Sequence, residues 1–258
     1  MLRDSYLATI GGGNHFVEIQ VVEEILDGGA AWQWGVRPGN IAVMVHSGSR
    51  SVGRHIGKQW LRHATDAWPA DRPRPTITPL HGELARRYVT AMHTAANYAS
   101  VNRMLLAELV RQAMRAVYDD ALEAPLVFDA PHNLVFEEGG MLIHRKGATP
   151  AHAGQPVLIP GSMGHSSYLC RGLGNPDFLS SASHGAGRAL TRQQMHRLAR
   201  EGGDLGLSCV DCITLKEERT IQEAPAAYKP IGDVIDVQVE AGIVAPVARM
   251  RPLLTFKA

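Results

Sequence analysis

The sequence predicts an α+β fold in which mixed sheets are flanked by helices. Strand-like and helical segments do not alternate regularly along the chain, as they would in a doubly wound parallel sheet. The chain has 258 residues, 45% of them hydrophobic, which is enough to bury one large core or two small ones. Length and composition therefore fit a folded protein with a sizeable apolar interior.

Two strand-like runs stand near the N-terminus. Residues 15–22 (HFVEIQVV) alternate between apolar and polar side chains, as a half-buried strand does. Residues 41–50 (IAVMVHSGSR) begin as an apolar run, which predicts a buried strand, and end abruptly in a loop of small polar residues. Four prolines fall within residues 66–80, so we expect an irregular connection there.

The longest helical signal lies in residues 81–118. Apolar side chains recur there every three or four residues, which predicts one or two helices. The members of this pattern are Leu84, Tyr88, Met92, Ala95, Ala99, Met104, Leu105, Leu109 and Met114. Short strands that end in Gly or Pro turns are expected after it, at residues 125–129, 140–144, 156–160 and 167–171.

The C-terminal part of the chain predicts two more helices and a strand. Residues 191–200 are expected to form a helix with Thr191 near its cap. Residues 230–242 read as a helix opened by Pro230 and closed by Gly242. Residues 243–256 are expected to form a final strand or a pair of strands.

Charge and cysteine content narrow the classes of protein that fit. The formal net charge is +1, so bulk charge does not indicate a nucleic-acid binder and any anion site must be local. Three cysteines fit a reducing compartment, and the pair Cys209 and Cys212 is interpreted as incidental because no further zinc ligands stand nearby. We find neither an apolar run of roughly 18 residues nor a signal peptide, which predicts a cytoplasmic, soluble protein.

Three histidines stand at or just beyond strand-like runs, next to Gly, Ser or Asn. They are His15, His46 and His132. Histidines from separate loops can ligate one metal centre, although each of these also fits an ordinary turn. Because triphosphate chemistry needs a divalent cation to offset charge, the three together indicate a metal-dependent phosphate site.

His184 stands in a different setting, the segment SASHGAGR at 181–188. Glycines allow a ligand to approach the backbone closely, and free backbone N–H groups bind anions. A histidine there is a candidate nucleophile toward phosphorus, or alternatively a buried turn residue. The loop PGSMGHSSY at 160–168 suits a nucleotide base or phosphate, and Arg50 offers a fork of N–H donors to a phosphate.

Taken in order, these segments resemble the RtcB family of RNA ligases. The matching segments are GGGNHFVEIQ, VHSGSR, PHN, RKGATPA, PGSMG with SY, SASHGAGR, and EAPAAYKPIGDVIDVQVEAGIV. The resemblance implies a single RtcB-like catalytic domain over residues 1–258, corresponding to the C-terminal major part of the family's fold. It also implies an enzyme, dependent on GTP and two manganese ions, that joins an RNA 3′-phosphate or 2′,3′-cyclic phosphate to a 5′-hydroxyl.

The resemblance assigns roles to individual residues. His184 would be guanylylated, His15, His46 and His132 would ligate manganese, and Arg50 would face an RNA phosphate. Lys257 would read the guanine, near His184. The nucleotide contacts it implies are Asn14, His15, Phe16, Val17, Glu18, His132, Asn133, Pro160, Gly161, Ser162, Met163, Ser167, His184, Gly185, Ala186, Gly187 and Lys257.

The sequence departs from the family pattern at one point. Family members carry an N-terminal Asp-x-x-Cys pair that completes the two-metal site, and this sequence has no counterpart to it. We therefore keep three hypotheses: a ligase whose missing segment or archease-like activator comes from elsewhere, an inactive truncated remnant that still binds nucleotide or RNA, and a histidine-rich metal phosphohydrolase. Imidazoles alone bind a divalent ion more weakly than a site that includes carboxylate and thiolate.

Overall fold

The computed structural model describes residues 4–258, and their contacts divide the chain into two compact units. One unit contains residues up to 9 together with 47–122, and the other contains 10–46 and 123–258. We call them the helical unit and the sheet unit. Whether 1–258 folds as one domain is not tested by this division and stays a prediction. No helix within the described residues is long and apolar enough to cross a membrane.

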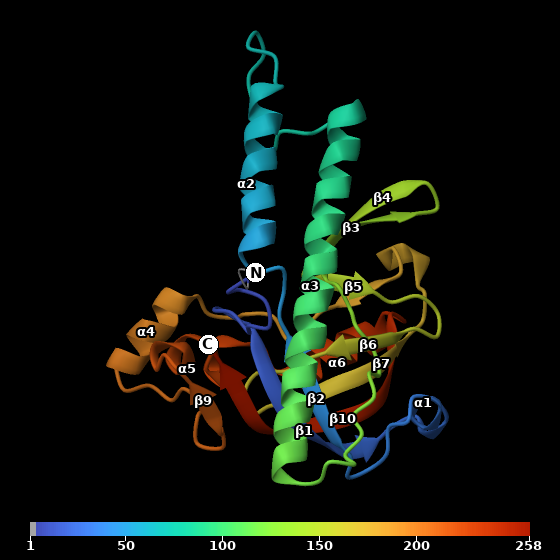
Figure 1. Cartoon of the computed structure of the whole chain (residues 1–258), viewed down its shortest axis with the longest axis vertical. Coiled ribbons are helices and arrows are strands. Elements are labelled where there is room, and N and C mark those ends of the chain that lie inside the picture. The colour runs from blue at the N-terminus through green and yellow to red at the C-terminus, as the bar shows by residue number, and fades with distance from the viewer. Residues whose placement is uncertain (1–3) are drawn as a thin grey trace. The chain divides into compact units, whose positions relative to one another are not determined.

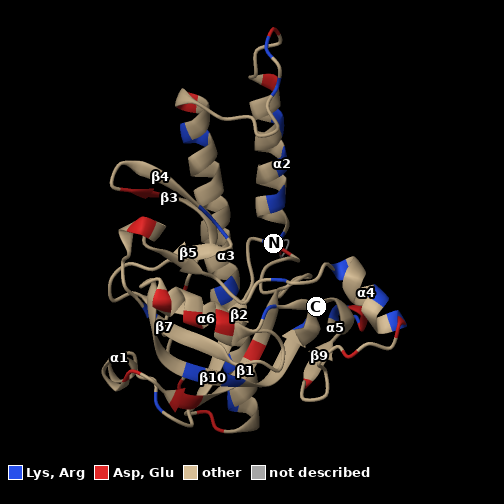
Figure 2. Cartoon of the chain, turned by 180° about the vertical axis from the view of Figure 1, so that it is seen from behind, with Lys and Arg blue, Asp and Glu red and all other residues tan. Residues whose placement is uncertain are grey.

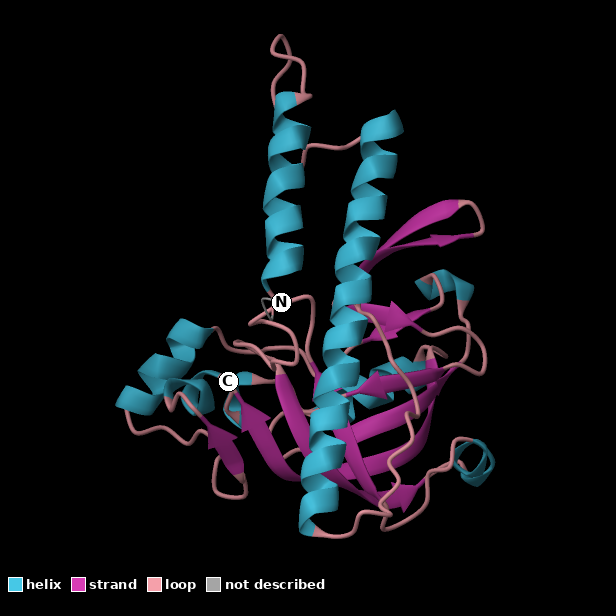
Figure 3. Cartoon of the chain, in the orientation of Figure 1, coloured by secondary structure: helices cyan, strands magenta, loops and turns pink. Residues whose placement is uncertain are grey.

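The sheet unit is built on a six-stranded sheet that is antiparallel except for one short strand (Figures 1 and 3). Its order is β2 (Ile41–His46), β1 (Phe16–Ile25), β10 (Val244–Lys257), β7 (Ser167–Gly172) and β6 (Pro156–Ile159). The remaining strand, β9 (Cys212–Thr214), pairs in parallel with the end of β10. Register shifts interrupt β10 against both β1 and β7, and such irregularities bend a strand and increase its twist.

The core of this unit lies on both faces of the sheet. One cluster includes Val157, Ile159 and Val244 from the strands, together with Ile231 and Ile235 from α6 (Ile231–Glu240). Another cluster joins Val22, Met44, Leu169, Ala248 and Met250. Burial on both faces explains why the first five residues of β10, Val244 to Ala248, are all apolar.

Smaller elements surround this sheet. The hairpin of β3 (Asn133–Glu138) and β4 (Met141–Lys146) turns at Gly139 and Gly140, which both have positive φ, as a type I′ turn requires. Two short strands, β5 (Ala148–Pro150) and β8 (Ser181–Ser183), pair with each other. The remaining helices are α1 (Gly28–Gln33), α4 (Arg192–Arg200), α5 (Glu218–Gln222) and the single 3₁₀ turns Pro176–Phe178 and Pro225–Ala227.

The helical unit consists of α2 (Ser51–Asp66) and α3 (Gly82–Val117), which lie side by side (Figure 1). Trp60 of α2 meets Tyr88 of α3 edge to face, with ring centroids 5.7 Å apart. The fully buried Asn102 side chain of α3 donates to Thr9 O, Ser47 Oγ and Gly48 O and accepts from Thr9 N. One amide therefore fixes both loop segments of this unit to the long helix.

Most of the predicted elements are confirmed. The strands at 15–22, 156–160 and 167–171 are present, and 81–118 forms one helix of 36 residues. Residues 66–80 are irregular apart from the last helical residue of α2, Asp66. The strand expected at 140–144 is β4, and 243–256 forms one strand. Thr191 and Pro230 are the N-caps of α4 and α6.

Two predictions are wrong. Residues 125–129 pair with no strand among the described residues, and Leu126 and Val127 are exposed there, so apolar composition without a pairing partner does not make a strand. The strand at 41–46 is present but not buried as predicted, because β2 lies at the sheet edge and leaves Ile41 and Val43 exposed. The sequence analysis also missed α2 and β3.

Candidate active site

A cavity of about 270 Å³ lies within the sheet unit. Its walls come from β1, the end of β10, the loop at 160–163, and the segments at 184–192 and 223–228. The predicted residues that line it are Asn14, Phe16, Glu18, His46, Pro160, Gly161, Ser162, Met163, His184, Gly185, Ala186, Gly187 and Lys257. The fold thus brings most of the predicted nucleotide contacts, scattered over more than 240 residues, around one hollow.

Other predicted residues do not line this cavity. Val17 is buried in the sheet. Ser167 Oγ accepts from Gly161 N at 3.2 Å and from Gln20 Nε2 at 3.0 Å, so it braces the loop at 160–163. Asn133 Oδ1 accepts from Gly147 N at 3.0 Å. Arg50 belongs to the helical unit, where its Nε donates to Thr9 Oγ1 at 2.9 Å.

The His184 ring is held at one nitrogen. Nδ1 donates to Gly147 O at 2.7 Å, and the ring stacks on His132 with centroids 4.8 Å apart. Because Nδ1 carries the proton in this bond, Nε2 of the neutral ring keeps its lone pair. Burial lowers the pKa of His184 below its ordinary value, and Lys146 lowers it further, although the bond to Gly147 opposes both. His184 is therefore a neutral imidazole near pH 7, in the form that can act as a nucleophile.

Three histidine rings lie around the ring of His46. Its centroid lies 5.7 Å from His15, 4.9 Å from His132 and 6.4 Å from His184. Burial, followed by the neighbouring histidines, lowers the pKa of His46 well below its ordinary value, which keeps that ring neutral. The three expected metal ligands thus lie together, yet no group of three or more His, Cys, Asp or Glu side chains in residues 4–258 is arranged to hold a metal ion.

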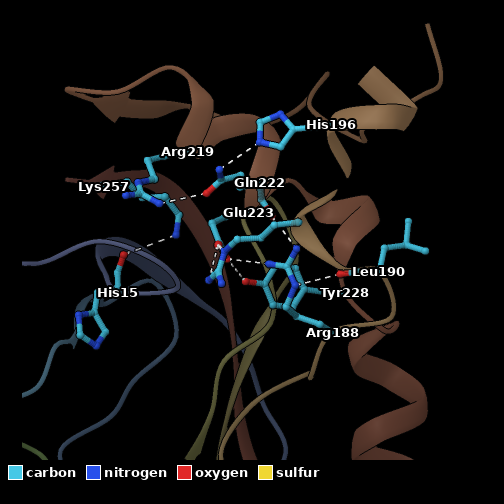
Figure 4. A network of polar contacts seen from close by, with 10 residues as sticks. His15, Arg188, Leu190, His196, Arg219, Gln222, Glu223, Tyr228 and Lys257 are labelled. Carbon is cyan, nitrogen blue, oxygen red and sulfur yellow. Dashed lines mark hydrogen bonds and ion pairs between the residues drawn. The ribbon is translucent and has the colours of Figure 1, made fainter. Parts of the chain in front are cut away.

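Glu18 and Lys257 form another part of the wall. Glu18 accepts from Thr255 Oγ1 at 2.7 Å and from Gln20 Nε2 at 2.5 Å, and burial raises its pKa. Lys257 is 6% exposed, and its Nζ donates to His15 O at 3.5 Å (Figure 4). Burial lowers the pKa of Lys257, although Glu223, Cys212 and Glu18 oppose the shift. The expected strand at 253–256 is present and carries Lys257 to the cavity that His184 lines.

The sequence analysis missed a buried polar network at this cavity. The carboxylate of Glu223 is fully buried and accepts from Arg188 Nη1 at 3.0 Å, Arg192 Nε at 3.1 Å and the Tyr228 hydroxyl (Figure 4). Burial and the Glu223 charge raise the pKa of Tyr228. All four residues line the cavity. The sequence signal for this network is Glu223, which stands directly before the small apolar residues APAA. A charged side chain among apolar residues is buried only when it is paired.

The two glycines that follow His184 are favoured for different reasons. Gly187 has a φ of +74°, and an added Cβ there would meet no atom within 4 Å, so its backbone conformation alone favours glycine. At Gly185 an added Cβ would lie 3.3 Å from Pro160 O, a tight contact, so the close packing of two loops favours the small residue there. Both loops are thereby held against the cavity, with Ala186 N donating to Pro160 O at 3.0 Å.

The charges on the lining suit an anion. Arg188, Arg192 and Lys257 contribute three cations, Glu18 and Glu223 contribute two carboxylates, and Glu223 is already paired with both arginines. Guanidinium groups bind phosphate oxygens well because their N–H donors form a planar fork. The cavity can therefore hold a phosphorylated ligand beside the free nitrogen of His184.

Comparison with known proteins places these features in a family. Residues 2–258 match the family described as "tRNA-splicing ligase RtcB". The chain is 34% identical to the tRNA-splicing ligase RtcB of Methanococcus maripaludis and 37% identical to that of Pyrococcus horikoshii, over 97% and 96% of its length. It is 38% identical, over 96% of its length, to the RNA-splicing ligase RtcB of Mycobacterium tuberculosis.

The chain spans only part of these relatives. The aligned region covers 59% of the Methanococcus protein, 32% of the Pyrococcus protein and 63% of the Mycobacterium protein. The match to the family nevertheless extends over nearly the whole chain, and the mixed α and β architecture agrees with it. The chain belongs to the RtcB family.

Proposed function

We propose that this chain carries the guanylyl-transfer centre of a GTP-dependent RNA ligase, with His184 as the nucleophile. The observation that carries the proposal is the hydrogen bond from His184 Nδ1 to Gly147 O, made by a ring that lines the cavity. The names of the relatives, tRNA-splicing and RNA-splicing ligases, support RNA as the substrate. A cytoplasmic location and an archease-like activator belong to the same proposal.

The first step is nucleophilic substitution at phosphorus. Nε2 of His184 attacks the α-phosphorus of GTP, a P–N bond forms, and the P–O bond to pyrophosphate breaks as pyrophosphate leaves. Nδ1 keeps its proton, and Gly147 O stabilises the positive charge that develops on the ring. Arg188 and Arg192 offset phosphate charge, while Glu18 and Lys257 contact the guanine.

Two further steps complete the joining of RNA ends. An oxygen of the RNA 3′-phosphate attacks the guanylyl phosphorus, so that the P–N bond breaks and His184 is restored. The 5′-hydroxyl of the second RNA end then attacks the activated 3′-phosphate, and GMP leaves with the new phosphodiester in place. A 2′,3′-cyclic phosphate end must first be hydrolysed to a 3′-phosphate.

This proposal includes a manganese site at the histidine cluster. His15, His46 and His132 would hold it, and a bound divalent ion offsets phosphate charge during the transfer. Imidazole nitrogen is a common ligand of transition metals, and the rings of His15 and His132 both lie near that of His46. They do not by themselves make up a complete ligand set, so we derive no step through the metal.

The test is covalent labelling of the protein by GTP that carries label in its α-phosphate. The protein is incubated with it, with and without manganese and a segment bearing the family's Asp-x-x-Cys pair, and is then denatured in alkali. A phosphoramidate survives alkali and is lost in acid. We expect label on the wild type and none on His184→Ala, while His144→Ala, a change at an exposed histidine, is labelled like the wild type.

Equal labelling of the wild type and His184→Ala would overturn the proposal. Release of phosphate from GTP without any covalent adduct would instead support the metal phosphohydrolase hypothesis, which the histidine cluster also favours. If the protein binds nucleotide but acquires no covalent label under all of these conditions, the result would support the hypothesis of an inactive remnant.

A further inference from the structure

Basic side chains recur every fourth residue at the start of the helical unit. Arg50 is the N-cap residue of α2, and Arg54, Lys58 and Arg62 follow within the helix. Residues four apart are neighbours on a helix surface. The three helical members, which we call the α2 basic row, therefore form one continuous line.

The α2 basic row points away from the packed side of its helix. The apolar row of α2 consists of Val52, Ile56, Trp60 and Ala64, each offset by two residues from a basic position, while the further apolar residue Leu61 is exposed. Two residues correspond to about 200° of rotation in an α-helix. Trp60 and Ala64 are buried, and Trp60 meets Tyr88 of α3. Arg54, Lys58 and Arg62 are all exposed, and Figure 2 shows the basic residues spread along α2.

No carboxylate neutralises this row. Within residues 4–258, Arg54, Lys58 and Arg62 form no ion pair. Two exposed arginines elsewhere do form such pairs: Arg86 with Glu83 in α3, and Arg197 with Glu201 in the sheet unit. An exposed row of cations without partners keeps its full charge available to an outside anion.

The two units also differ in net charge. Residues 1–9 and 47–122 carry twelve Lys and Arg against seven Asp and Glu, a net charge of +5. The sheet unit carries 14 basic against 18 acidic residues, a net charge of −4. The overall charge of +1 thus conceals a basic helical unit, and α2 contributes three basic residues to it against one acidic residue, Asp66.

We propose that the α2 basic row, whose members do not line the cavity, binds the phosphate backbone of RNA. The row from Arg54 to Arg62 is about 12 Å long at 1.5 Å per residue, which suits successive phosphates of a strand. Contacts of this kind give affinity without sequence preference. The choice of RNA as the bound polyanion rests on the proposed function.

The test compares RNA binding by two triple variants over a range of salt concentrations. One is Arg54→Gln, Lys58→Gln and Arg62→Gln, and glutamine preserves helix propensity. The matched control is Arg86→Gln, Arg111→Gln and Arg197→Gln, which removes the same charge from arginines that already pair with a glutamate. Binding to a fluorescent single-stranded RNA with 3′-hydroxyl ends is measured by anisotropy, without GTP.

We expect the row variant to bind RNA more weakly and with less salt dependence. Three lost phosphate contacts reduce the slope of log K against log salt by about 2. When salt is raised from 50 to 200 mM, the fold-loss of RNA affinity is therefore roughly 15- to 20-fold smaller for the row variant than for the wild type. The control variant keeps the wild-type slope, and circular dichroism shows unchanged helix content in all three proteins.

Equal slopes for the row and control variants would overturn the inference, as would binding of anionic vesicles in place of RNA. Covalent labelling by GTP is measured on the same proteins and separates this inference from the proposed function. Labelling unchanged by the row variant is expected. A complete lack of labelling, with RNA binding still lost in the row variant, would refute the proposed nucleotide chemistry and leave the RNA surface standing.

Discussion

At the scale of single residues, the candidate site depends on how one imidazole is held. Gly147 accepts the Nδ1 proton of His184 through its carbonyl oxygen, and its own N–H is shared between His132 O and Asn133 Oδ1. Two predicted site residues, His132 and Asn133, thus act on His184 through the backbone of Gly147. Gly147 itself has a φ of +70°, so the conformation that aims its carbonyl favours glycine.

Replacing Gly147 by alanine is therefore expected to disturb the position of His184 in addition to lowering the free energy of unfolding. A Cβ there would lie 3.3 Å from Cε1 of His184, in addition to the left-handed strain of about 1–2 kcal/mol. Gly202→Ala is the matched control, because Gly202 has a φ of +72° and no atom within 4 Å of the added Cβ. Both variants should lose similar free energy of unfolding in urea, and only Gly147→Ala should lose covalent labelling. Equal labelling of the two would mean that the Gly147 contact does not position His184.

Glu18 gives the free energy of unfolding a pH dependence that can be checked. Burial raises its pKa in the folded state, against hydrogen bonds from Thr255 and Gln20 that lower it. A raised folded pKa means that the contribution of Glu18 is fully present below its unfolded pKa of about 4.3, and is lost as pH rises through the folded value.

The variant Glu18→Gln cannot ionise, so it lacks this loss. The free energy of unfolding of the wild type, minus that of Glu18→Gln, should therefore become less favourable to the wild type between pH 4 and pH 7. Urea unfolding at several pH values measures the difference, and only its change with pH matters, because glutamine also alters the hydrogen bonds. A difference that stays constant, or that moves the other way, would contradict a raised pKa.

At the scale of elements, the N-terminal cap of α4 fixes a helix end that lies at the cavity. Thr191 Oγ1 accepts from Gln194 N at 3.2 Å, and Gln194 Oε1 accepts from Thr191 N at 2.8 Å, which is a complete capping box. Arg192 is the first residue of the helix, lines the cavity and pairs with Glu223. The cap therefore fixes the helix end that carries a cavity-lining cation.

Removing this cap should weaken α4 measurably. We expect Thr191→Ala to reduce the free energy of unfolding by about 1 kcal/mol, while Thr191→Ser keeps the capping oxygen and loses only a few tenths. Urea unfolding with an unchanged m-value measures both. If the alanine and serine variants were equally stable, the capping box would contribute nothing, and Met195, which is fully buried, would hold the helix alone.

The same scale shows where sequence patterns predict elements and where they fail. Periodic apolar residues predicted α3 because its 36 residues repeat the pattern many times. In α2 the apolar row has four members, and Gly53 and Gly57 lower helix propensity, so packing against α3 decides its structure. The strand predicted at residues 125–129 is wrong for the opposite reason. A segment of strand-forming residues stays irregular when no neighbouring strand pairs with it.

For the site, the sequence predicted those residues whose role is local chemistry and missed those whose role depends on distant partners. The loops around His184 and at 160–168 were recognisable because small residues, Gly, Ala and Ser, gather in them. Glu223 and Tyr228 were not selected, since their importance depends on Arg188 and Arg192 meeting them across 31 to 40 residues of chain. No short pattern in the sequence encodes such a meeting.

At the scale of the whole molecule, the division into units follows the chain only loosely. Residues 47–122 interrupt the sheet unit between β2 and β3, so each unit is assembled from two stretches of sequence. The irregular order of strand-like and helical segments predicted an α+β fold correctly, whereas composition gave only the average charge. The contrast between a basic helical unit and an acidic sheet unit becomes visible when contacts define the units.

The pairing of β1 with β10 has a consequence for the growing chain on the ribosome. Glu18 and Thr255 are 237 residues apart, and Lys257 reaches His15 across 242 residues. At 5–20 residues per second, the gap between the end of β1 and the start of β10 takes roughly 10 to 45 s to translate. During that time β2 can pair with one edge of β1, while the other edge has no partner and is open to wrong strands. The cavity is therefore among the last parts of the nascent protein to form, and β1 is the strand for which protection by a chaperone matters most.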